Sequence, residues 1–437
     1  MDFHNYTLIT ILCIVLIFNF LYSIKSMPTK INPSSMYGFG FMVGAIMCYV
    51  FKSEWEMYDW GMMTFMLVLV GVLSFTITNA LLLYLFPIKS TNKNISNIKN
   101  NQLKKGLVLL ILFYQLIYFG LYYYLVLGGV SISNFAVALL DVRQEDAALP
   151  PLIQRLELFS SVFTYYMEFL MSKNIALKIK NSYARLVLIV SIVSIMGTFL
   201  SGAKGFAIYQ VLFIIFAVTI IKYKVSPIKS QRVLNFKKML KYSLLGVVAI
   251  WAFGAIADLQ GRGSELGPLY YFGIYSGGGT RNLDLFVNSS VPSSAFFGEY
   301  SFHMFDDTKV EFHENRFVGG YPTGNLATAF QYYYKDFGLI GTGLFVVLIA
   351  IIMFYLYKKA ILTKELESNT FSVWIFLFAY LGRGLALSFF SETFFLLFFS
   401  VYQMRTIILI LLFAWLMDKK GLEKAIHTKQ AKVLKYT

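Results

Sequence analysis

The stretch DLQGRGSELGPLYYFGIYSGGGTRNLDLF, residues 258–286, differs from the rest of the chain in being polar and rich in glycine. It opens a long polar segment that ends with YPTGNLATAFQYYYKD, residues 321–336. Glycine, tyrosine, arginine and carboxylate are mixed in this segment, whereas the flanking sequence consists of apolar runs. Flexible backbone beside aromatic rings and fixed charges suits a binding site for a sugar phosphate. The segment is therefore predicted to be a functional loop between helices.

The apolar runs on both sides of this loop predict an all-α, polytopic integral membrane protein. The 437 residues are 57% hydrophobic and 14% charged, and apolar runs near spanning length recur,. We expect about eleven transmembrane helices, at 7–24, 35–51, 61–86, 106–126, 157–171, 186–201, 203–221, 241–257, 338–357, 371–390 and 394–417. The predicted organisation is eight helices with short loops in 1–257, a large outward loop in 258–337, and three helices with a tail in 338–437.

The basic residues predict the orientation of these helices. Most of the 38 lysines and arginines lie in alternate connections, and the largest groups are in 89–105, 222–241 and the C-terminal tail. Because basic residues are retained on the cytoplasmic side, the N-terminus is predicted outside and the C-terminus inside. The 127–157 connection and the long loop then face outward. The net charge of +15 is thereby explained by topology, and no nucleic-acid partner is predicted,.

Several kinds of chemistry find no support in the sequence. The short cytoplasmic connections contain no Gly-rich phosphate loop, so direct use of ATP is not expected,. Cys13 and Cys48 lie in apolar runs and do not suggest a disulfide framework,. His303 and His313 are ten residues apart, without the spacing of zinc ligands, and an Asp306–Asp307 metal site is weaker than a solvated turn,. We predict no metal and no cofactor.

Basic residues outside the cytoplasmic connections are disfavoured by the insertion rule and therefore need an explanation. Lys204, in Leu-Ser-Gly-Ala-Lys-Gly, is interpreted either as a phosphate ligand or as a turn lysine that reaches lipid headgroups,. Arg281 follows three glycines, whose amides either form an anion-binding nest or a flexible turn,. Arg383 and Arg405 lie in the last apolar runs, where Glu392 is a candidate partner and a structural ion pair is as plausible as a substrate contact,. Further candidates, with solvated loop charges as the alternative, are Arg143, Arg262 and Arg316.

The outward segments also contain candidates for a general base and for contacts with sugar. A carboxylate or histidine near an apolar lid can act as the base that takes a proton from a sugar hydroxyl. The candidates are Asp258, Asp284, Glu299, His303, Asp306, Asp307, His313 and Asp336. The tyrosines of the loop, Tyr275 and Tyr333 among them, are interpreted either as anchors at the membrane interface or as stacking surfaces for sugar rings,.

At these residues the sequence resembles the O-antigen and oligosaccharide repeat-unit polymerases, the Wzy family. The resemblance rests on Leu-Ser-Gly-Ala-Lys-Gly at 200–205, on the eleven-helix plan with a large late outward loop, and on residues 324–341. The last of these contains Tyr-Lys-Asp336-Phe-Gly338, which resembles the family's entry to the helix after the loop. Lys204 stands where many members have arginine.

The resemblance implies a GT-C-like fold in the bacterial inner membrane and a role in lipopolysaccharide biosynthesis. The implied reaction is an inverting, metal-independent transfer of the growing glycan from undecaprenyl pyrophosphate to the non-reducing end of another lipid-linked repeat unit. Lys204, Arg281 and Arg383 are expected to stabilise the leaving group, Arg143 to steer the acceptor or the lipid phosphate, and Asp258, Asp284 or Asp336 to act as base. Expected partners are the lipid-linked oligosaccharide, membrane lipids, a chain-length regulator and a flippase. The alternatives are an O-antigen ligase and a flippase or transporter of lipid-linked oligosaccharide.

Overall fold

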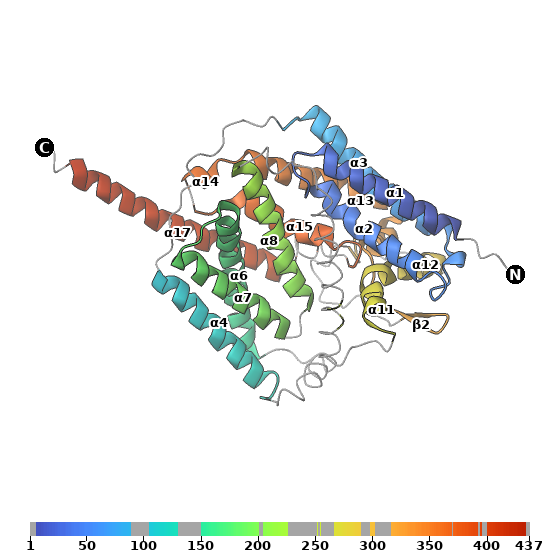
Figure 1. Cartoon of the computed structure of the whole chain (residues 1–437), viewed down its shortest axis with the longest axis horizontal. Coiled ribbons are helices and arrows are strands. Elements are labelled where there is room, and N and C mark those ends of the chain that lie inside the picture. Colours follow the sequence, from blue (N-terminus) through green and yellow to red (C-terminus); the bar gives the residue numbers. More distant parts are fainter. Residues whose placement is uncertain are drawn as a thin grey trace. The chain divides into compact units, whose positions relative to one another are not determined.

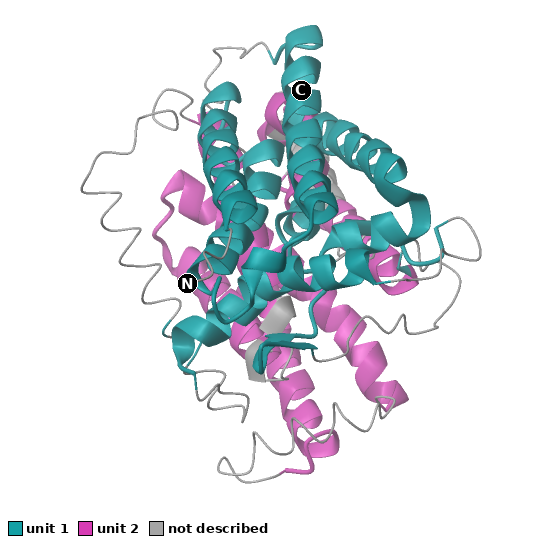
Figure 2. Ribbon diagram, turned by 90° about the vertical axis from the view of Figure 1, so that its right-hand side faces the viewer, with its two compact units in different colours: residues 1–89, 228–358, 380–400 teal, residues 90–227, 359–379, 401–437 magenta. Residues whose placement is uncertain are grey.

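The chain is largely helical. The computed structural model describes residues 6–88, 105–129, 150–200, 204–225, 251, 254, 266–289, 298–301, 316–368, 370–391, 394–395 and 400–433. These residues form two compact units, each built from segments far apart in the sequence (Figure 2). Unit 1 comprises residues 1–89, 228–358 and 380–400, and unit 2 comprises residues 90–227, 359–379 and 401–437. Figure 1 labels the elements along the chain.

The longer helices overlap the predicted apolar runs. Those within unit 1 are α1 (Thr7–Ser26), α2 (Pro33–Val50), the 3₁₀ turn η1 (Met57–Asp59), α3 (Met62–Leu85), α11 (Pro268–Gly273), the π-helical turn η3 (Ile274–Gly278) and α12 (Gly279–Asn288). Those within unit 2 are α4 (Lys105–Leu125), α6 (Pro151–Leu177), α7 (Ser182–Leu200), α8 (Lys204–Val225), α14 (Glu365–Ser368) and α17 (Val401–Val433). Helices α13 (Ala329–Leu362) and α15 (Val373–Ala386) contribute to both units. The predicted run at 241–257 lies outside the described residues, apart from Trp251 and Gly254.

Five of the described helices are long and apolar enough to cross a membrane. They are α1, α3, α4, the 207–225 part of α8, and the segment that begins with α13. Shorter apolar helices occur at 182–198, 373–386 and 401–417. The protein is thus a mostly helical chain with several membrane-spanning candidates.

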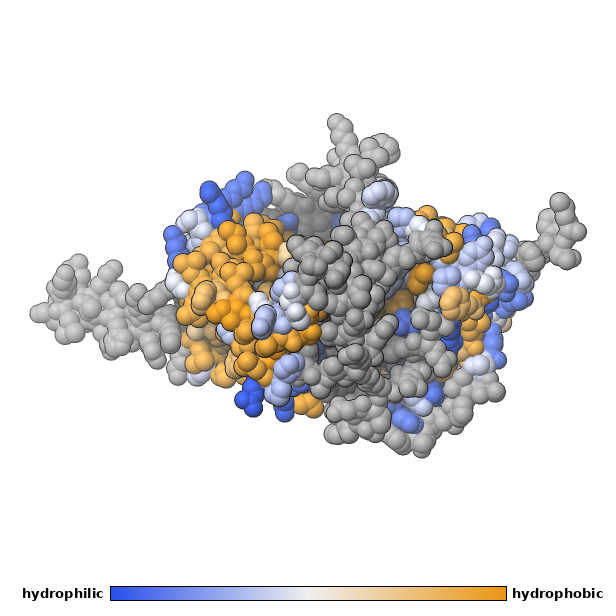
Figure 3. Space-filling model, turned by 90° about the horizontal axis from the view of Figure 1, so that it is seen from below, coloured by the Kyte–Doolittle hydropathy of each residue, from blue (hydrophilic) through white to orange (hydrophobic). Residues whose placement is uncertain are grey.

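Large apolar side chains are exposed on the surface of the helices. Figure 3 shows a broad hydrophobic surface over unit 2 where α4 lies. On that helix Leu110, Phe113 and Tyr124 are among the exposed residues. A soluble protein rarely leaves so much contiguous apolar surface exposed, so this face suits contact with lipid.

The long polar segment contains regular structure that the sequence did not predict. Strand β1 (Arg316–Val318) pairs antiparallel with β2 (Tyr321–Gly324), and α11, η3 and α12 precede them. Phe330, in the first turn of α13, stacks on Phe41 of α2 with ring centroids 4.7 Å apart. Its ring also fills the space beside Gly71 of α3, where a Cβ atom would lie 2.4 Å from it. The polar segment is therefore packed onto α2 and α3 of unit 1.

Gly338 interrupts α13. Its φ of 64° and ψ of −168° are non-helical and separate residues 329–337 from the long apolar helix that follows. A positive φ of this kind favours glycine. The long apolar helix predicted from residue 338 thus follows this break, although helical structure already begins at Ala329.

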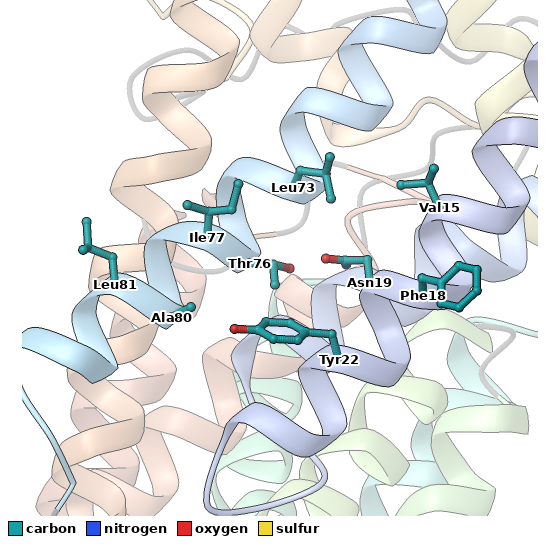
Figure 4. Close-up of a pocket in the computed structure, with 9 residues that line it drawn as sticks. All are labelled: Val15, Phe18, Asn19, Tyr22, Leu73, Thr76, Ile77, Ala80 and Leu81. Atoms are coloured by element: carbon teal, nitrogen blue, oxygen red, sulfur yellow. The ribbon is translucent and has the colours of Figure 1, made fainter.

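Unit 1 also has an apolar groove between α1 and α3, with a volume of about 590 Å³. Figure 4 shows its lining, where Asn19 and Thr76 lie among apolar side chains such as Phe18 and Leu81. The lining suits a hydrocarbon chain better than a diphosphate, so we place no catalytic role there.

Candidate functional site

The most distinctive polar feature of unit 1 is a buried ion pair on α12. Arg281 Nη1 lies 2.5 Å from Asp284 Oδ2, and the two residues are 4% and 1% exposed. The other carboxylate oxygen of Asp284 accepts hydrogen bonds from the Gly61 amide at 2.9 Å and from the Thr64 hydroxyl at 2.7 Å. Asn288 Nδ2 donates to the same oxygen at 3.1 Å. Asp284 thereby fixes α12 to the start of α3 and holds the arginine.

This arrangement changes the expected role of Asp284. Its two carboxylate oxygens accept four hydrogen bonds, one of them from arginine, and the residue is 1% exposed. A general base must lie within hydrogen-bond reach of the hydroxyl that it deprotonates, and these contacts already occupy both oxygens. Asp284, predicted as a candidate base, is better described as the counter-ion that orients Arg281.

The predicted anion-binding nest at the three glycines is wrong. Gly278 and Gly279 have helical dihedral angles, with φ near −55° and −58°, whereas a nest alternates right-handed and left-handed residues,. The glycines instead permit close packing. A Cβ atom on Gly278 would lie 2.1 Å from the Thr323 carbonyl oxygen, and one on Gly277 would lie 2.8 Å from Met47 Cβ. The glycine run is therefore neither a nest nor a flexible turn.

Three polar atoms around the first turn of α12 have no hydrogen-bond partner among the described residues. They are Arg281 Nε, Thr280 Oγ1 and Thr328 Oγ1, and all three are buried. The Thr328 side chain lies beside Gly279, at 3.4 Å from the position of a Cβ atom. We call Thr280, Arg281, Asp284 and Thr328 the α12 cluster. A buried polar atom without a partner costs about 1–3 kcal/mol, so such a concentration marks a candidate binding site.

Asn282 connects this cluster to the hairpin, a role that sequence reasoning missed. Its Nδ2 donates to the carbonyl oxygens of Gly324 at 3.0 Å and Leu326 at 2.9 Å. Its Oδ1 accepts from the Thr323 hydroxyl at 2.7 Å. Arg316, a predicted substrate contact, is half-buried and donates through Nη1 to the Asn282 carbonyl oxygen at 3.2 Å. The hairpin thus places a second arginine next to α12.

Tyr270 of α11 also connects the helices to the hairpin. Its hydroxyl accepts from Trp55 Nε1 at 2.8 Å and donates to the Pro322 carbonyl oxygen at 3.1 Å. Burial raises the pKa of Tyr270, and the hydrogen bond from Trp55 opposes this effect. The phenol therefore stays protonated at neutral pH and continues to donate to β2.

Asp336, another predicted base, is used as a backbone anchor. Its Oδ2 accepts from the Ser301 amide at 2.6 Å, and both oxygens accept from the Tyr300 amide at 3.1 Å. Lys335 Nζ lies over the Tyr300 ring, 3.7 Å from its centroid. These contacts hold residues 298–301 against the start of α13.

The two predicted sugar-binding tyrosines differ in accessibility. Tyr333 is fully buried, and its ring packs against Phe345 and Phe395 at 5.6 and 6.1 Å between centroids. Tyr275 is partly exposed, stacks on Phe390 at 5.9 Å, and accepts a hydrogen bond from the Tyr271 hydroxyl at 3.1 Å. Tyr333 therefore occupies a packing position, and Tyr275 is the better surface for a ligand.

Arg383 is buried in unit 1 with 1% exposure. Its guanidinium carbon lies 3.5 Å from the centroid of the Tyr380 ring, and its Nε donates to the Tyr380 carbonyl oxygen at 2.8 Å. The cation is thus partly compensated by an aromatic face. Its suggested partner Glu392 lies outside the described residues.

Of the remaining sequence candidates, one belongs to unit 2 and the others lie outside what the structure describes. Arg405 is exposed on α17 in unit 2. Lys204 begins α8, but its side chain lies outside what the structure describes. Other candidates in segments that are not described are Arg143, Asp258, Arg262, His303 and His313. Among the described residues, no group of three His, Cys, Asp or Glu side chains is placed to hold a metal ion.

Comparisons of the chain with protein-family models, with curated proteins and with solved structures found no match. The fold and the site define a helical protein with candidate membrane spans and a buried arginine–carboxylate pair in its long polar segment. An assignment of a particular activity therefore rests on the residues of this chain.

Proposed function

We propose that this protein is a membrane-embedded glycosyltransferase that polymerises oligosaccharide repeat units carried on a polyprenyl diphosphate. A hydroxyl oxygen of the acceptor repeat unit attacks the anomeric carbon of the donor glycan. The bond from that carbon to the diphosphate oxygen breaks, the configuration inverts, and the acceptor proton passes to a base. The diphosphate leaves with the bonding electrons and acquires negative charge.

The observation that carries the proposal is the hydrogen bonding of the Arg281 guanidinium. Asp284 holds one NH group of its guanidinium, while Nε faces no partner among the described residues. A guanidinium fixed on one edge is preorganised to donate from another edge to an oxyanion. Thr280, which precedes Arg281 on α12, and Thr328, whose side chain lies beside Gly279, add two buried hydroxyl groups without a partner among the described residues. Such donors stabilise a leaving diphosphate without any reorganisation during the reaction.

Other parts of the proposal follow from the sequence interpretation. The chain would have eleven membrane helices in a GT-C-like plan, with the N-terminus and the 258–337 loop outside. Arg383 and Lys204 would add positive charge for the diphosphate, and Arg316 and Tyr275 would contact the sugar. Asp284 and Asp336 are engaged as acceptors in the structure, so we assign the role of base to Asp258 among the three predicted aspartates.

The glycan pattern of a strain that lacks the gene tests the proposal. Loss of a polymerase leaves single repeat units attached to the lipid core, and restoring the chain restores the full ladder. Loss of a ligase leaves no repeats on the core although polymer accumulates on the lipid carrier. Loss of a flippase leaves single lipid-linked units on the cytoplasmic side. Either of the last two patterns would replace the proposed reaction.

A further inference from the structure

A polar cavity lies inside unit 2, whereas the α12 cluster belongs to unit 1. Its volume is about 70 Å³, and residues of α4, α6, α7, α8 and α17 line it (Figure 1 labels these helices). Its oxygen-bearing lining residues include Glu157, Ser161, Thr164, Gln210, Tyr402 and Thr406. The lining contains no lysine, arginine or histidine. A polar cavity among apolar helices is costly to maintain, so it calls for a ligand.

Gln210, which lines this cavity, has a side-chain oxygen without a hydrogen-bond donor among the described residues. The Thr198 hydroxyl donates to the Ser194 carbonyl oxygen at 2.8 Å, so Thr198 Oγ1 can only accept a further hydrogen bond. Gln210 Nε2 donates to that oxygen at 3.0 Å, which fixes the orientation of the amide,. Gln210 Oε1 is consequently a buried carbonyl oxygen with no donor among the described residues, on a side chain that is 5% exposed.

The neighbouring hydroxyl groups also present acceptors. The Thr406 hydroxyl donates to the Tyr402 carbonyl oxygen at 2.9 Å, which leaves the lone pairs of Oγ1 available. Thr164 Oγ1 already accepts from Gln115 Nε2 at 3.1 Å, and the Ser161 and Tyr402 hydroxyls share one hydrogen bond at 3.2 Å. Tyr118 and Gln403 also line the cavity and carry donors, but Gln210 Oε1 and Thr406 Oγ1 remain as acceptor oxygens that suit a cation,.

Glu157 supplies the negative charge. It lies one helical turn before Ser161 and about two turns before Thr164, on the same face of α6,. All three residues line the cavity. No ion pair of Glu157 is found among the described residues. One carboxylate surrounded by neutral oxygen atoms matches the charge of a monovalent ion.

We propose that this cavity binds a small alkali-metal cation, with sodium as the ion that it fits. A calcium site usually draws six to eight oxygen ligands, several of them carboxylates, and magnesium demands a near-ideal octahedron with retained water. A single carboxylate with amide and hydroxyl oxygens serves a monovalent ion instead. About 70 Å³ leaves room for the ion and one or more waters that complete its shell,.

Binding of radioactive ²²Na⁺ to the purified full-length protein in detergent tests this site directly. We expect saturable binding near one ion per chain, displaced by excess NaCl and not by choline chloride. Glu157→Gln, which keeps the shape and removes the charge, is expected to weaken binding at least tenfold. Gln210→Met, which removes the unpaired carbonyl oxygen, is expected to weaken it several-fold. The matched control is Glu367→Gln, an exposed carboxylate of the same unit, with unchanged binding expected.

Thermal unfolding provides a second readout that does not depend on activity. NaCl is expected to raise the midpoint of the wild-type protein above that in choline chloride of equal ionic strength, and to give no such difference in Glu157→Gln. Absence of saturable ²²Na⁺ binding would show that the cavity holds water only and would overturn the proposal. Equal binding by the wild type and a folded Glu157→Gln variant would overturn it as well. Because no arm measures glycosyl transfer, these results are independent of the proposed reaction.

Discussion

Arg281 and Asp284, one turn apart on α12, form an ion pair of 2.5 Å that is almost completely buried. The carboxylate also binds the Gly61 amide and the Thr64 hydroxyl, so the pair connects the polar segment to the membrane helix α3. The guanidinium keeps Nε without a partner among the described residues. Asp284 therefore has a structural role, whereas Arg281 is held in place and can still donate a hydrogen bond from Nε.

Asp284→Ala is expected to destabilise unit 1 by about 3–5 kcal/mol, because it leaves a buried arginine without its counter-ion. Asp284→Asn is expected to cost less, since an amide oxygen still accepts from Gly61 and Thr64. Chemical or thermal unfolding in detergent measures both variants. Asp59→Ala, an exposed carboxylate of unit 1, is the control with little expected change. Wild-type stability of Asp284→Ala would contradict the anchoring role.

Gly278→Ala is expected to destabilise the protein by about 1–3 kcal/mol or more, because the new methyl group would overlap the Thr323 carbonyl oxygen,. The oxygen belongs to the backbone of β2 and cannot rotate away. Gly120→Ala on α4 is the matched control, since nothing lies within 4 Å of its Cβ position. Yield and unfolding midpoint compare the two. Equal behaviour of both variants would mean that the glycine run is not closely packed.

Much of this fold is readable from the sequence because membrane helices are long and apolar. The runs at 7–24, 61–86 and 106–126 coincide with α1, α3 and α4 within a few residues. The short run at 157–171 belongs to a longer helix, Pro151–Leu177. Polar residues at both ends of that helix conceal its length in the sequence. Gly338 was identifiable because its neighbours change from polar and aromatic to apolar at that point.

The connections within the site were not predictable from local pattern. Asp284 meets Gly61 and Thr64 across more than two hundred residues, and Asn282 meets Thr323 across 41. The hairpin strands contain only three and four residues, too few to show an alternating pattern. Local sequence alone therefore predicts Asp284 as a base, whereas its hydrogen bonds to distant residues give it a structural role.

The orientation of the chain is predicted to be N-terminus outside and C-terminus inside, because most basic residues lie in alternate connections,. An alkaline phosphatase fusion near Val291 is expected to be active, and one near Lys229 inactive. The first position lies in the outward loop and the second in a lysine-rich connection. The reverse pattern at both positions would contradict the topology and the placement of the site.

Glycosyl transfer is expected to continue in excess EDTA, because fixed cations of the protein would receive the charge of the diphosphate. The purified enzyme with lipid-linked repeat units provides the assay, and chain extension is followed on gels. Activity that is lost with EDTA and restored by Mg²⁺ or Mn²⁺ would remove this mechanism and point to Asp306–Asp307.

The central claim is that Arg281 binds the diphosphate of the donor, and polymerisation by its variants tests it most directly. Arg281→Ala is expected to abolish the glycan ladder at matched amounts of inserted protein. Arg281→Lys is expected to restore only part of it, because an ammonium keeps the charge and loses the planar fork. One such donor to a leaving group is worth about 2–4 kcal/mol of barrier, a loss of roughly a hundredfold or more in rate. Near-normal ladders from both variants would contradict the account.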